Sequence, residues 1–437
     1  MFKRIHFVGI KGAGMSGLAQ LFHKEGVIVS GSDTTEEFPT DKNLTNIGIV
    51  PSSFSKDNIK GDIDCVIYSK AYKNDHPEIK KAREMNIPLM DYGEALAHLF
   101  NQKKGIVVIG THGKTTTTAM LAKIFEDAGL EPSALVGGEV LNWQNNMRAG
   151  SGEYFIAEGD EYQEKFLDLE PQAILITNIE YDHPDFFPDF PAYKNAFRKL
   201  IERLKPASLC VVFEEDKNSL DVSDDLGSKR IIFGPKLQAD VFKRIKLCVP
   251  GYHNRINALG AFALARNFGI DEDLIIKSLA GFQGVRRRLE HYNGPEQKFL
   301  IIDDYAHHPT EIRVSISALR EAYPDRKIVL AFQPHTFSRT EALFGDFIRA
   351  FDGVYFLAIA DIYTSAREAV GEINSSVLVA QIKKRGINAV YAPRLEDVYK
   401  FFEKIIGSAG DEKYIFVTMG AGDIWKVARD IKMKYNL

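Results

Sequence analysis

A glycine-rich segment at residues 110–118, GTHGKTTTT, has the residue types that bind a nucleotide phosphate. Gly110 and Gly113 permit positive φ angles and a close approach of the backbone, and the amides and dipole of a following helix attract anions. Lys114 can neutralise β- and γ-phosphate oxygens, while the Thr115 hydroxyl can bind Mg²⁺. These features predict a phosphate-binding loop between a strand and a helix.

The loop is two residues shorter than the usual phosphate-loop pattern. That pattern, GxxxxGK[ST], would place a glycine at position 108, where this chain has Val108. A glycine turn with an incidental lysine is the alternative interpretation. The buried strand GIVVIG before the segment, the helix expected after it and the four consecutive threonines favour phosphate binding.

Two polar residues follow later strands and could bind a metal ion. Glu158 ends the strand EYFIAE, and a carboxylate at a strand tip commonly holds Mg²⁺ beside a phosphate loop. The alternative is a solvated acidic turn in EGDEYQE, which is the interpretation given to Glu164. His183, in NIEYDHPDFF after the strand AILITN, is either a metal ligand or a packed loop histidine. Taken alone, its residue type favours packing.

A second glycine pattern lies near the N-terminus, in VGIKGAGMSG at residues 8–17. Gly12, Gly14 and Gly17 form GxGxxG between an expected strand and an expected helix, with Asp33 about twenty residues further on. The pattern would suit NAD, but any nucleotide diphosphate, including that of a UDP-sugar, would fit the same loop and helix start. Tight strand-to-helix packing without a ligand is the third interpretation.

The elements that must position these residues alternate between strands and helices. In the first hundred residues, strands are expected at 5–9, 27–31 and 65–68, and helices are expected at 15–25 and 77–85. Alternation of this kind predicts an α/β fold with largely parallel sheets.

Two further series of elements follow. The polar stretch NQKK at 101–104 precedes a second series, with strands in GIVVIG, EYFIAE and AILITN and an amphipathic helix at about 191–204. A third series begins near Phe299, with strands in FLIIDD, KIVLAFQ, GVYFLAI and KYIFVT. Helices through 311–322 and 340–351 separate those strands. A doubly wound unit is therefore expected at each end of the chain.

The composition is that of a folded, multidomain protein. The chain has 437 residues, 45% hydrophobic and 26% charged, which at roughly 150 residues per domain suggests about three domains. A net charge of −4 disfavours a nucleic-acid partner, and no apolar stretch is long enough to span a membrane or to form a secretory signal. Cys65, Cys210 and Cys248 are scattered singly, so neither a disulfide framework nor a CxxC zinc site is encoded. A cytoplasmic protein of undetermined oligomeric state is expected.

The chain resembles the Mur ligases, the cytoplasmic enzymes that build the peptide stem of peptidoglycan precursors. The motifs that carry the resemblance are, in order, GIKGAGMSG, SGSD, GTHGKTTTT, AEGDE, TNIEYDH, YHNRINALGA, FQGVRRRLE, DDYAHHPTE, FQPHTFSRT and GAGDI. Each motif is modest alone, but ten in one order are highly specific. The resemblance implies a UDP-sugar-binding Rossmann-like domain at 1–100, a central ATP-binding domain at 101–296 and a Rossmann-like amino-acid-binding domain at 297–437.

The resemblance also implies which residues bind ATP and metal. The ATP-binding residues are expected to be Gly110, Thr111, His112, Gly113, Lys114, Thr115, Thr116, Asn254, Asn257, Arg287, Arg288 and Asp304. The two asparagines should line the adenine side, the two arginines should reach the phosphates, and the aspartate should face ATP from the third domain. Thr115, Glu158 and His183 should hold Mg²⁺ or Mn²⁺, so the likeness makes His183 a ligand. Where other members have a lysine carbamate, this chain has Arg198, and no carbamate is expected.

The resemblance places the remaining substrates on the outer domains. The UDP-sugar-binding residues are expected to be Gly9, Gly12, Gly14, Met15, Ser16, Ser32, Asp33 and Ser69. His307, His308 and Arg339 are expected to bind the amino acid. Thr336 stands where the alanine-adding branch often has a first arginine, which leaves Arg339 as the carboxylate contact. Either histidine could serve as the base that takes a proton from the attacking amine, although HHPT can also be a simple helix entry with Pro309 at its first position.

Two motifs, DDYAHHPTE and FQPHTFSRT, are most similar to the branch that adds L-alanine to UDP-N-acetylmuramate. The expected reaction transfers the γ-phosphoryl group of ATP to the sugar-borne carboxylate, and the amine then attacks the acyl phosphate. Catalytic roles are expected for Lys114, Glu158, His183, Arg288, His307 and His308. DEY at 160–162 and EYDHPDFF at 180–187 are closer to the ligase that recycles a tripeptide onto UDP-N-acetylmuramate, which is the alternative. An NAD-dependent oxidoreductase, a regulatory phosphate-loop switch and folylpolyglutamate synthase rank below it.

Overall fold

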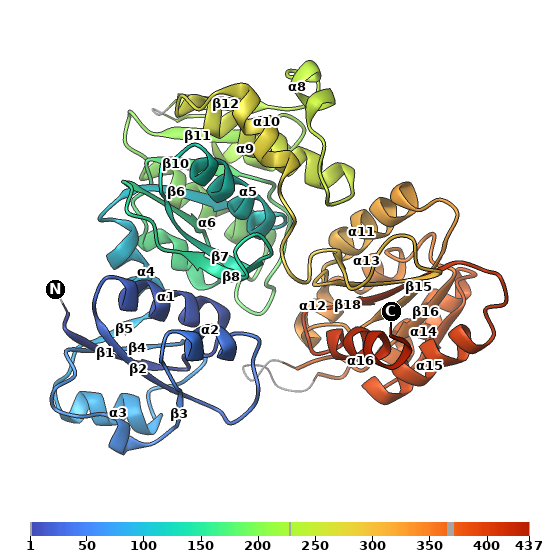
Figure 1. Ribbon diagram of the computed structural model, residues 1–437, viewed down its shortest axis with the longest axis horizontal. Helices are drawn as coiled ribbons and strands as arrows, with labels where there is room; N and C mark the ends of the chain where they lie inside the picture. The colour runs from blue at the N-terminus through green and yellow to red at the C-terminus, as the bar shows by residue number, and fades with distance from the viewer. Residues whose placement is uncertain (1, 227–228, 365–370, 437) are drawn as a thin grey trace. The chain divides into compact units, whose positions relative to one another are not determined.

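Three β-sheets organise the part of the chain that the computed structural model describes, residues 2–226, 229–364 and 371–436 (Figure 1). Helices alternate with the strands along the sequence, so the predicted α/β fold is confirmed. No helix among the described residues is long and apolar enough to cross a membrane.

The first sheet is parallel and has the strand order β3-β2-β1-β4-β5. Its strands are β1 (Arg4–Val8), β2 (Ile28–Asp33), β3 (Ser52–Ser53), β4 (Cys65–Tyr68) and β5 (Leu89–Asp91). The helices are α1 (Ala13–Lys24), α2 (Asp41–Asn46), α3 (Pro77–Glu84) and α4 (Tyr92–Phe100), with a 3₁₀ turn η1 (Lys56–Asn58). Strand order reverses at β1, since β2 pairs with one of its edges and β4 with the other. Open α/β sheets form a ligand crevice at such a point, at the carboxyl ends of the strands.

The second sheet is mixed, with the order β12-β11-β10-β6-β9-β7-β8. Its strands are β6 (Lys104–Ile109), β7 (Ser133–Val140), β8 (Asn145–Arg148), β9 (Tyr154–Glu158), β10 (Ala173–Ile176), β11 (Leu209–Phe213) and β12 (Lys229–Phe233). The helices in this part of the sequence are α5 (Lys114–Asp127), η2 (Tyr162–Asp168), α6 (Phe190–Glu202), α7 (Lys217–Val222), α8 (Ala239–Arg244), α9 (Tyr252–Asn267) and α10 (Glu272–Ala280). The antiparallel β7–β8 pair was not predicted. The central strand β6 is buried from Gly105 to Ile109, which explains its continuous apolar run.

The third sheet has the order β13-β14-β18-β15-β16-β17, antiparallel only between β13 and β14. Its strands are β13 (Glu290–His291), β14 (Phe299–Asp304), β15 (Lys327–Phe332), β16 (Phe356–Ile359), β17 (Ala389–Tyr391) and β18 (Tyr414–Met419). The helices are α11 (Pro309–Ala322), α12 (Phe337–Ala342), α13 (Phe344–Ile348), α14 (Ser375–Lys384), α15 (Leu395–Gly407) and α16 (Trp425–Tyr435). Ile302 and Leu330 belong to one core cluster, whereas their neighbours Ile301 and Val329 belong to another. Successive strand residues therefore pack on opposite faces of a sheet that is covered on both sides.

The helix expected through 340–351 is interrupted. Leu343 has φ −106° and ψ 19°, so α12 ends before it and α13 begins after it. The apolar spacing of the segment matches one helix, but a local backbone bend is not visible in that spacing.

The described chain divides into two compact units. The first comprises Met1–Glu180, Pro191–Lys246 and Asn257–Gln283, and the second comprises Tyr181–Phe190, Leu247–Ile256 and Gly284–Leu437. The first unit contains the first two sheets, and the second unit contains the third. The expected domain limits at 100 and 296 remain predictions.

Candidate functional site

The predicted phosphate loop lies between β6 and α5, with the backbone that its glycines were expected to allow. Gly110 has φ 134° and Gly113 has φ 79°, and Gly113 is the residue that begins α5. A Cβ atom at Gly110 would lie 2.2 Å from the Thr177 hydroxyl, and one at Gly113 would lie 2.7 Å from Asn257 Oδ1. Both positions therefore require glycine for conformation and for space.

The four threonines after Lys114 do not share one role. Thr117 and Thr118 donate hydrogen bonds to the carbonyls of Gly113 and Lys114, one turn back along the helix. Thr115 instead donates to Glu158 Oε1, at 3.1 Å. Thr115 is therefore the hydroxyl directed at a neighbouring carboxylate, whereas the hydroxyls of Thr117 and Thr118 bond to backbone carbonyls of the preceding turn.

Lys114 lies over its own loop and is held by a carboxylate that sequence reasoning missed. Its ammonium donates to the carbonyls of Gly110 and Thr111 at 2.6 and 3.1 Å, and to Glu161 Oε1 at 3.0 Å. The Lys114 and Glu161 side chains are only 13% and 3% exposed. Burial alone would lower the pKa of Lys114, but the negative charges of Glu161 and Glu158 raise it above its usual value. The lysine is therefore a buried cation.

Two of the three predicted metal ligands lie together in the first unit. Glu158 accepts the Thr115 hydroxyl through Oε1 and the Gly137 amide through Oε2, at 3.1 and 2.9 Å. Hydroxyl and carboxylate oxygens are hard donors of the kind that Mg²⁺ prefers, so this pair fits such an ion. His183 belongs to the second unit, where it has φ 56° and its Nε2 lies 3.8 Å from Asp182 Oδ2.

The other loop residues are fixed by the segment after β10. The His112 amide donates to Asn178 Oδ1 at 3.0 Å, and its ring contacts Glu180 Oε2 at 3.2 Å. The Thr111 hydroxyl donates to the Glu180 carbonyl at 2.8 Å. Thr116 is buried in the first turn of α5. Of the two expected adenine-side residues, Asn257 touches the loop at Gly113, whereas Asn254 lies in the second unit and donates to the Pro250 carbonyl at 2.7 Å.

In the second unit, Arg287 and Arg288 have different surroundings. The Arg287 guanidinium donates to Asp303 at 3.0 Å and to the Gly420 carbonyl at 2.6 Å, so it is engaged within the fold. Arg288 lies 3.6 Å from Glu311 and, like Arg287, covers the ring of Tyr305, at 5.0 Å from its centroid. Arg288 thus has the weaker partners of the two and is the better placed to exchange them for a phosphate.

The residues after β14 form a buried polar group. Asp304 accepts the Ser315 hydroxyl, and its burial raises the pKa of the carboxyl to about 6. His308 begins α11 and accepts the Thr310 amide, so it is a helix entry as the alternative interpretation proposed. Burial lowers the pKa of His307 to about 3, which keeps its imidazole neutral and makes it a weak base. Glu311 accepts the His307 amide at 3.0 Å and was not predicted.

Arg339, expected to contact the carboxylate of the amino acid, is paired with a carboxylate of the protein. Its Nε donates to Asp182 Oδ1 at 2.8 Å and its Nη2 to Oδ2 at 3.3 Å, with both side chains less than a tenth exposed. Its Nη1 donates to the His335 carbonyl at 3.3 Å. All three guanidinium nitrogens are therefore engaged inside the second unit.

The first glycine loop meets its neighbours at the carboxyl edge of the first sheet. Asp33 accepts the Lys11 amide at 2.7 Å, so this carboxylate ties the loop to β2. A Cβ atom at Gly9 would lie 2.5 Å from the Tyr72 ring, and one at Gly14 would lie 2.6 Å from Tyr92. Gly12 begins α1, and the side chains of Met15 and Ser16 are buried beneath it.

Ser32 and Ser69 are both engaged in local hydrogen bonds. The Ser32 hydroxyl is fully buried and donates to Glu78 Oε2, so it lies in the interior of the sheet edge rather than at its surface. Ser69 Oγ accepts the Ala71 amide at 3.3 Å, at the start of the loop after β4. To bind a UDP-sugar, either hydroxyl would have to exchange its present hydrogen bond for one to the ligand. The role of Ser32 and Ser69 in UDP-sugar binding remains a prediction.

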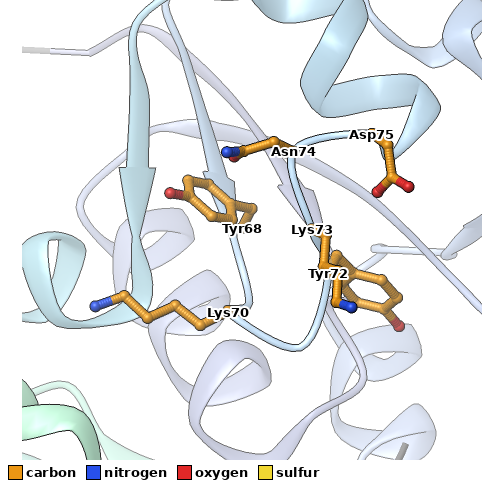
Figure 2. Close-up of a pocket in the computed structure, with 6 residues that line it drawn as sticks. All are labelled: Tyr68, Lys70, Tyr72, Lys73, Asn74 and Asp75. Carbon is orange, nitrogen blue, oxygen red and sulfur yellow. The ribbon is translucent and has the colours of Figure 1, made fainter. Parts of the chain in front are cut away.

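A cavity of about 510 Å³ opens beside this loop. It is lined by Tyr68, Lys70, Tyr72, Lys73, Asn74 and Asp75, which Figure 2 shows around the turn that follows β4. Lys70 pairs with Asp91 at 2.9 Å. Because β4 is the strand beside β1, the cavity lies next to the point where the strand order reverses, where a nucleotide is expected.

Family models match three successive parts of the chain. They are described as the Mur ligase family catalytic domain (residues 4–104), the Mur ligase middle domain (108–247) and the Mur ligase glutamate ligase domain (287–422). The UDP-N-acetylmuramate–L-alanine ligase of Desulfitobacterium hafniense is 40% identical, covering 98% of this chain and 99% of its own length. The corresponding enzyme of Syntrophomonas wolfei is 37% identical over 97% and 96%.

Solved structures agree with these relatives. A UDP-N-acetylmuramate–alanine ligase from Thermotoga maritima matches with a TM-score of 0.81 and 29% identity, covering 100% of this chain and 99% of that one. A murein peptide ligase from Psychrobacter arcticus matches with a TM-score of 0.71 at 21% identity, which shows a shared fold. The chain belongs to the Mur ligase family.

Proposed function

We propose that this chain is an ATP-dependent ligase that joins L-alanine to the carboxylate of UDP-N-acetylmuramate in the synthesis of peptidoglycan precursors. The phosphate loop carries the proposal, because it places a buried lysine beside a glycine backbone built for a triphosphate. The full-length relatives named for this reaction support L-alanine as the added amino acid. A cytoplasmic location is part of the proposal, because its substrates are ATP and a nucleotide-linked sugar.

The first step would make the carboxylate reactive. A carboxylate is a poor electrophile, so one of its oxygens attacks the γ-phosphorus of ATP, forming an acyl phosphate and releasing ADP. Lys114 and Arg288 would stabilise the negative charge that spreads over the transferred group, while Gly110–Thr116 hold the remaining phosphates. Thr115 and Glu158, with His183, would hold Mg²⁺, which neutralises phosphate charge when bound. Asn254, Asn257, Arg287 and Asp304 would complete the nucleotide site.

The second step would form the amide. The amine of L-alanine attacks the acyl carbon, and the phosphate leaves with the oxygen that came from the carboxylate. His307 and His308 would border the amine, and the neutral imidazole of His307 supports a hydrogen bond to it. Arg339 would bind the carboxylate of L-alanine, which would replace one of its two present partners, Asp182 or the His335 carbonyl.

The UDP-sugar would bind at the carboxyl edge of the first sheet. The backbone of Gly9–Ser16 and the start of α1 suit the diphosphate, with Ser32, Asp33 and Ser69 around them. The cavity beside Tyr68 and Lys70 supports room for the rest of the nucleotide. This assignment gives residues 1–100, 101–296 and 297–437 the UDP-sugar, ATP and amino-acid roles in turn.

One assay tests the function and its alternative. The purified chain is incubated with UDP-N-acetylmuramate, ATP and Mg²⁺, and with L-alanine, glycine, L-serine or the tripeptide in separate reactions. Product mass and phosphate release are then measured, with Lys114→Ala as the matched inactive control. The proposal predicts a product with L-alanine and little with the others. Product only with the tripeptide would replace it with the recycling ligase, and no amide with any acceptor would reject both.

A further inference from the structure

Buried hydrogen bonds link Lys114, through Glu161, to Tyr193 on α6, a helix far along the sequence. Glu161 Oε1 accepts a hydrogen bond from the Lys114 ammonium at 3.0 Å, and its Oε2 lies 2.9 Å from the same nitrogen as an ion pair. The Tyr193 hydroxyl, on α6, donates to Glu161 Oε1 at 3.3 Å. The same hydroxyl lies 2.9 Å from the Thr111 hydroxyl in the phosphate loop. A closed ring of contacts therefore runs from the lysine through Glu161 and Tyr193 back to the loop.

The members of this ring are enclosed by the first unit. Tyr193 is fully buried, and Glu161 is 2% exposed. Tyr193 also packs edge-on against Phe197, one helical turn further along α6, with ring centroids 5.2 Å apart. Its side chain has few alternative positions, so it fixes one oxygen of Glu161. Thr111 is held from the other side by the Glu180 carbonyl.

Such an arrangement restricts where the lysine can go. A free lysine side chain has four rotatable bonds and points its charge into water. Here two loop carbonyls and one carboxylate accept hydrogen bonds from the ammonium, so the nitrogen is held above the loop. When phosphate oxygens replace the loop carbonyls, the carboxylate can remain as the fixed partner, because Tyr193 holds it from α6.

We propose that Glu161 is a positioning residue for phosphoryl transfer, which holds the Lys114 ammonium where the transferred phosphoryl group needs it, and that Tyr193 holds Glu161. In this proposal both residues act through Lys114 and not by contact with substrate. The inference rests on the proposed ligase function, since it concerns the step in which ATP phosphorylates the carboxylate. We expect Glu161 to affect the rate of phosphoryl transfer more than the affinity for ATP. The loop amides also bind ATP in the ground state, whereas the negative charge that develops in the transition state is stabilised mainly by the ammonium.

The test is Glu161→Gln, which keeps the size of the side chain and removes its charge. We expect kcat to fall about 100-fold, as for a catalytic group displaced by about 1 Å, while the ATP dissociation constant and the KM for UDP-N-acetylmuramate stay close to the parental values. Glu161→Asp, which restores charge at a shorter reach, should recover part of the loss. Tyr193→Phe should lower kcat about fivefold, the effect of one hydrogen bond.

The matched control lies three residues along the same segment. Glu164 pairs with Lys199 at 2.6 Å, but these side chains are 30% and 47% exposed, so Glu164→Gln should leave kcat unchanged. Parental kcat in Glu161→Gln, or tighter ATP binding with faster turnover, would overturn the inference. If Glu161→Gln does not fold, parental kcat in Tyr193→Phe overturns it. Failure of the unmodified chain to form an amide would instead reject the proposed function, so the two failures are distinguishable.

Discussion

The buried pair between Asp182 and Arg339 gives the prediction that depends most directly on the geometry of the second unit. Asp182→Asn removes the negative charge and leaves the guanidinium enclosed, at 5% side-chain exposure, without its counter-ion. Breaking a buried pair from one side costs about 3–5 kcal/mol. Asparagine keeps one carbonyl acceptor for Arg339, so we take the lower end, about 3 kcal/mol. For a domain of this size that corresponds to a fall in Tm of roughly 6–12 °C.

The assay can report on the second unit alone. The chain has two tryptophans, of which Trp143 belongs to the first unit and Trp425 to the second. In a Trp143→Phe background, the fluorescence of Trp425 follows unfolding of the second unit during heating. The matched control is Glu396→Gln, which breaks a solvent-exposed pair with Lys400, whose side chains are 61% and 62% exposed, and should leave the Tm unchanged. If the Tm of Asp182→Asn lies within about 2 °C of the Tm of the control variant, the reasoning about this pair is refuted.

Three further predictions concern the phosphate loop, a proposed Mg²⁺ ligand and a buried carboxyl group. Gly110→Ala forces a φ of 134° on a residue whose Cβ would lie 2.2 Å from Thr177 Oγ1, so the loop must move and kcat should fall by about 100-fold; parental turnover would contradict this. Glu158→Gln weakens the oxygen pair with Thr115, so the Mg²⁺ concentration for half-maximal turnover should rise by at least about tenfold, and an unchanged Mg²⁺ titration would exclude Glu158 as a ligand. Burial raises the pKa of Asp304 to about 6 from a usual 3.8, so between pH 3.8 and 6 the folded state keeps a proton that the unfolded chain releases, and stability falls as pH rises through that window. Asp304→Asn should remove this fall, which amounts to about 3 kcal/mol, in unfolding curves measured at pH 4 and pH 7, and an identical pH dependence in both proteins would show that Asp304 does not titrate there.

Local sequence patterns predicted the strand, glycine turn and helix around residues 110–118, because the requirements of this backbone are local. The tight turn between β6 and α5 requires positive φ at Gly110 and Gly113, and glycine is the residue that adopts it most easily. The position of Lys114 at the start of α5 could be predicted because it directly follows this turn. The continuous apolar strands also identified the α/β class, since a strand covered on both faces leaves that signature.

Contacts between distant residues account for what was missed. EGDEYQE contains four carboxylates, and only the packing of Tyr193, on a helix 32 residues further along the chain, selects Glu161 as the buried one. The local sequence does not distinguish Glu161, because Asp160 and Glu164 lie in the same acidic segment. The pairing of Arg339 with Asp182 was not predicted, because the two residues are 157 positions apart in the sequence. Such pairings depend on the tertiary fold and not on the neighbouring sequence.

The central claim is that ATP phosphorylates the sugar-borne carboxylate. It is tested by preparing UDP-N-acetylmuramate with ¹⁸O in that carboxylate and measuring the mass of the phosphate released during amide formation with L-alanine. The account predicts one ¹⁸O atom in each phosphate, because the oxygen that attacks the γ-phosphorus leaves with it. Unlabelled phosphate, with amide formed at the normal rate, would contradict the account.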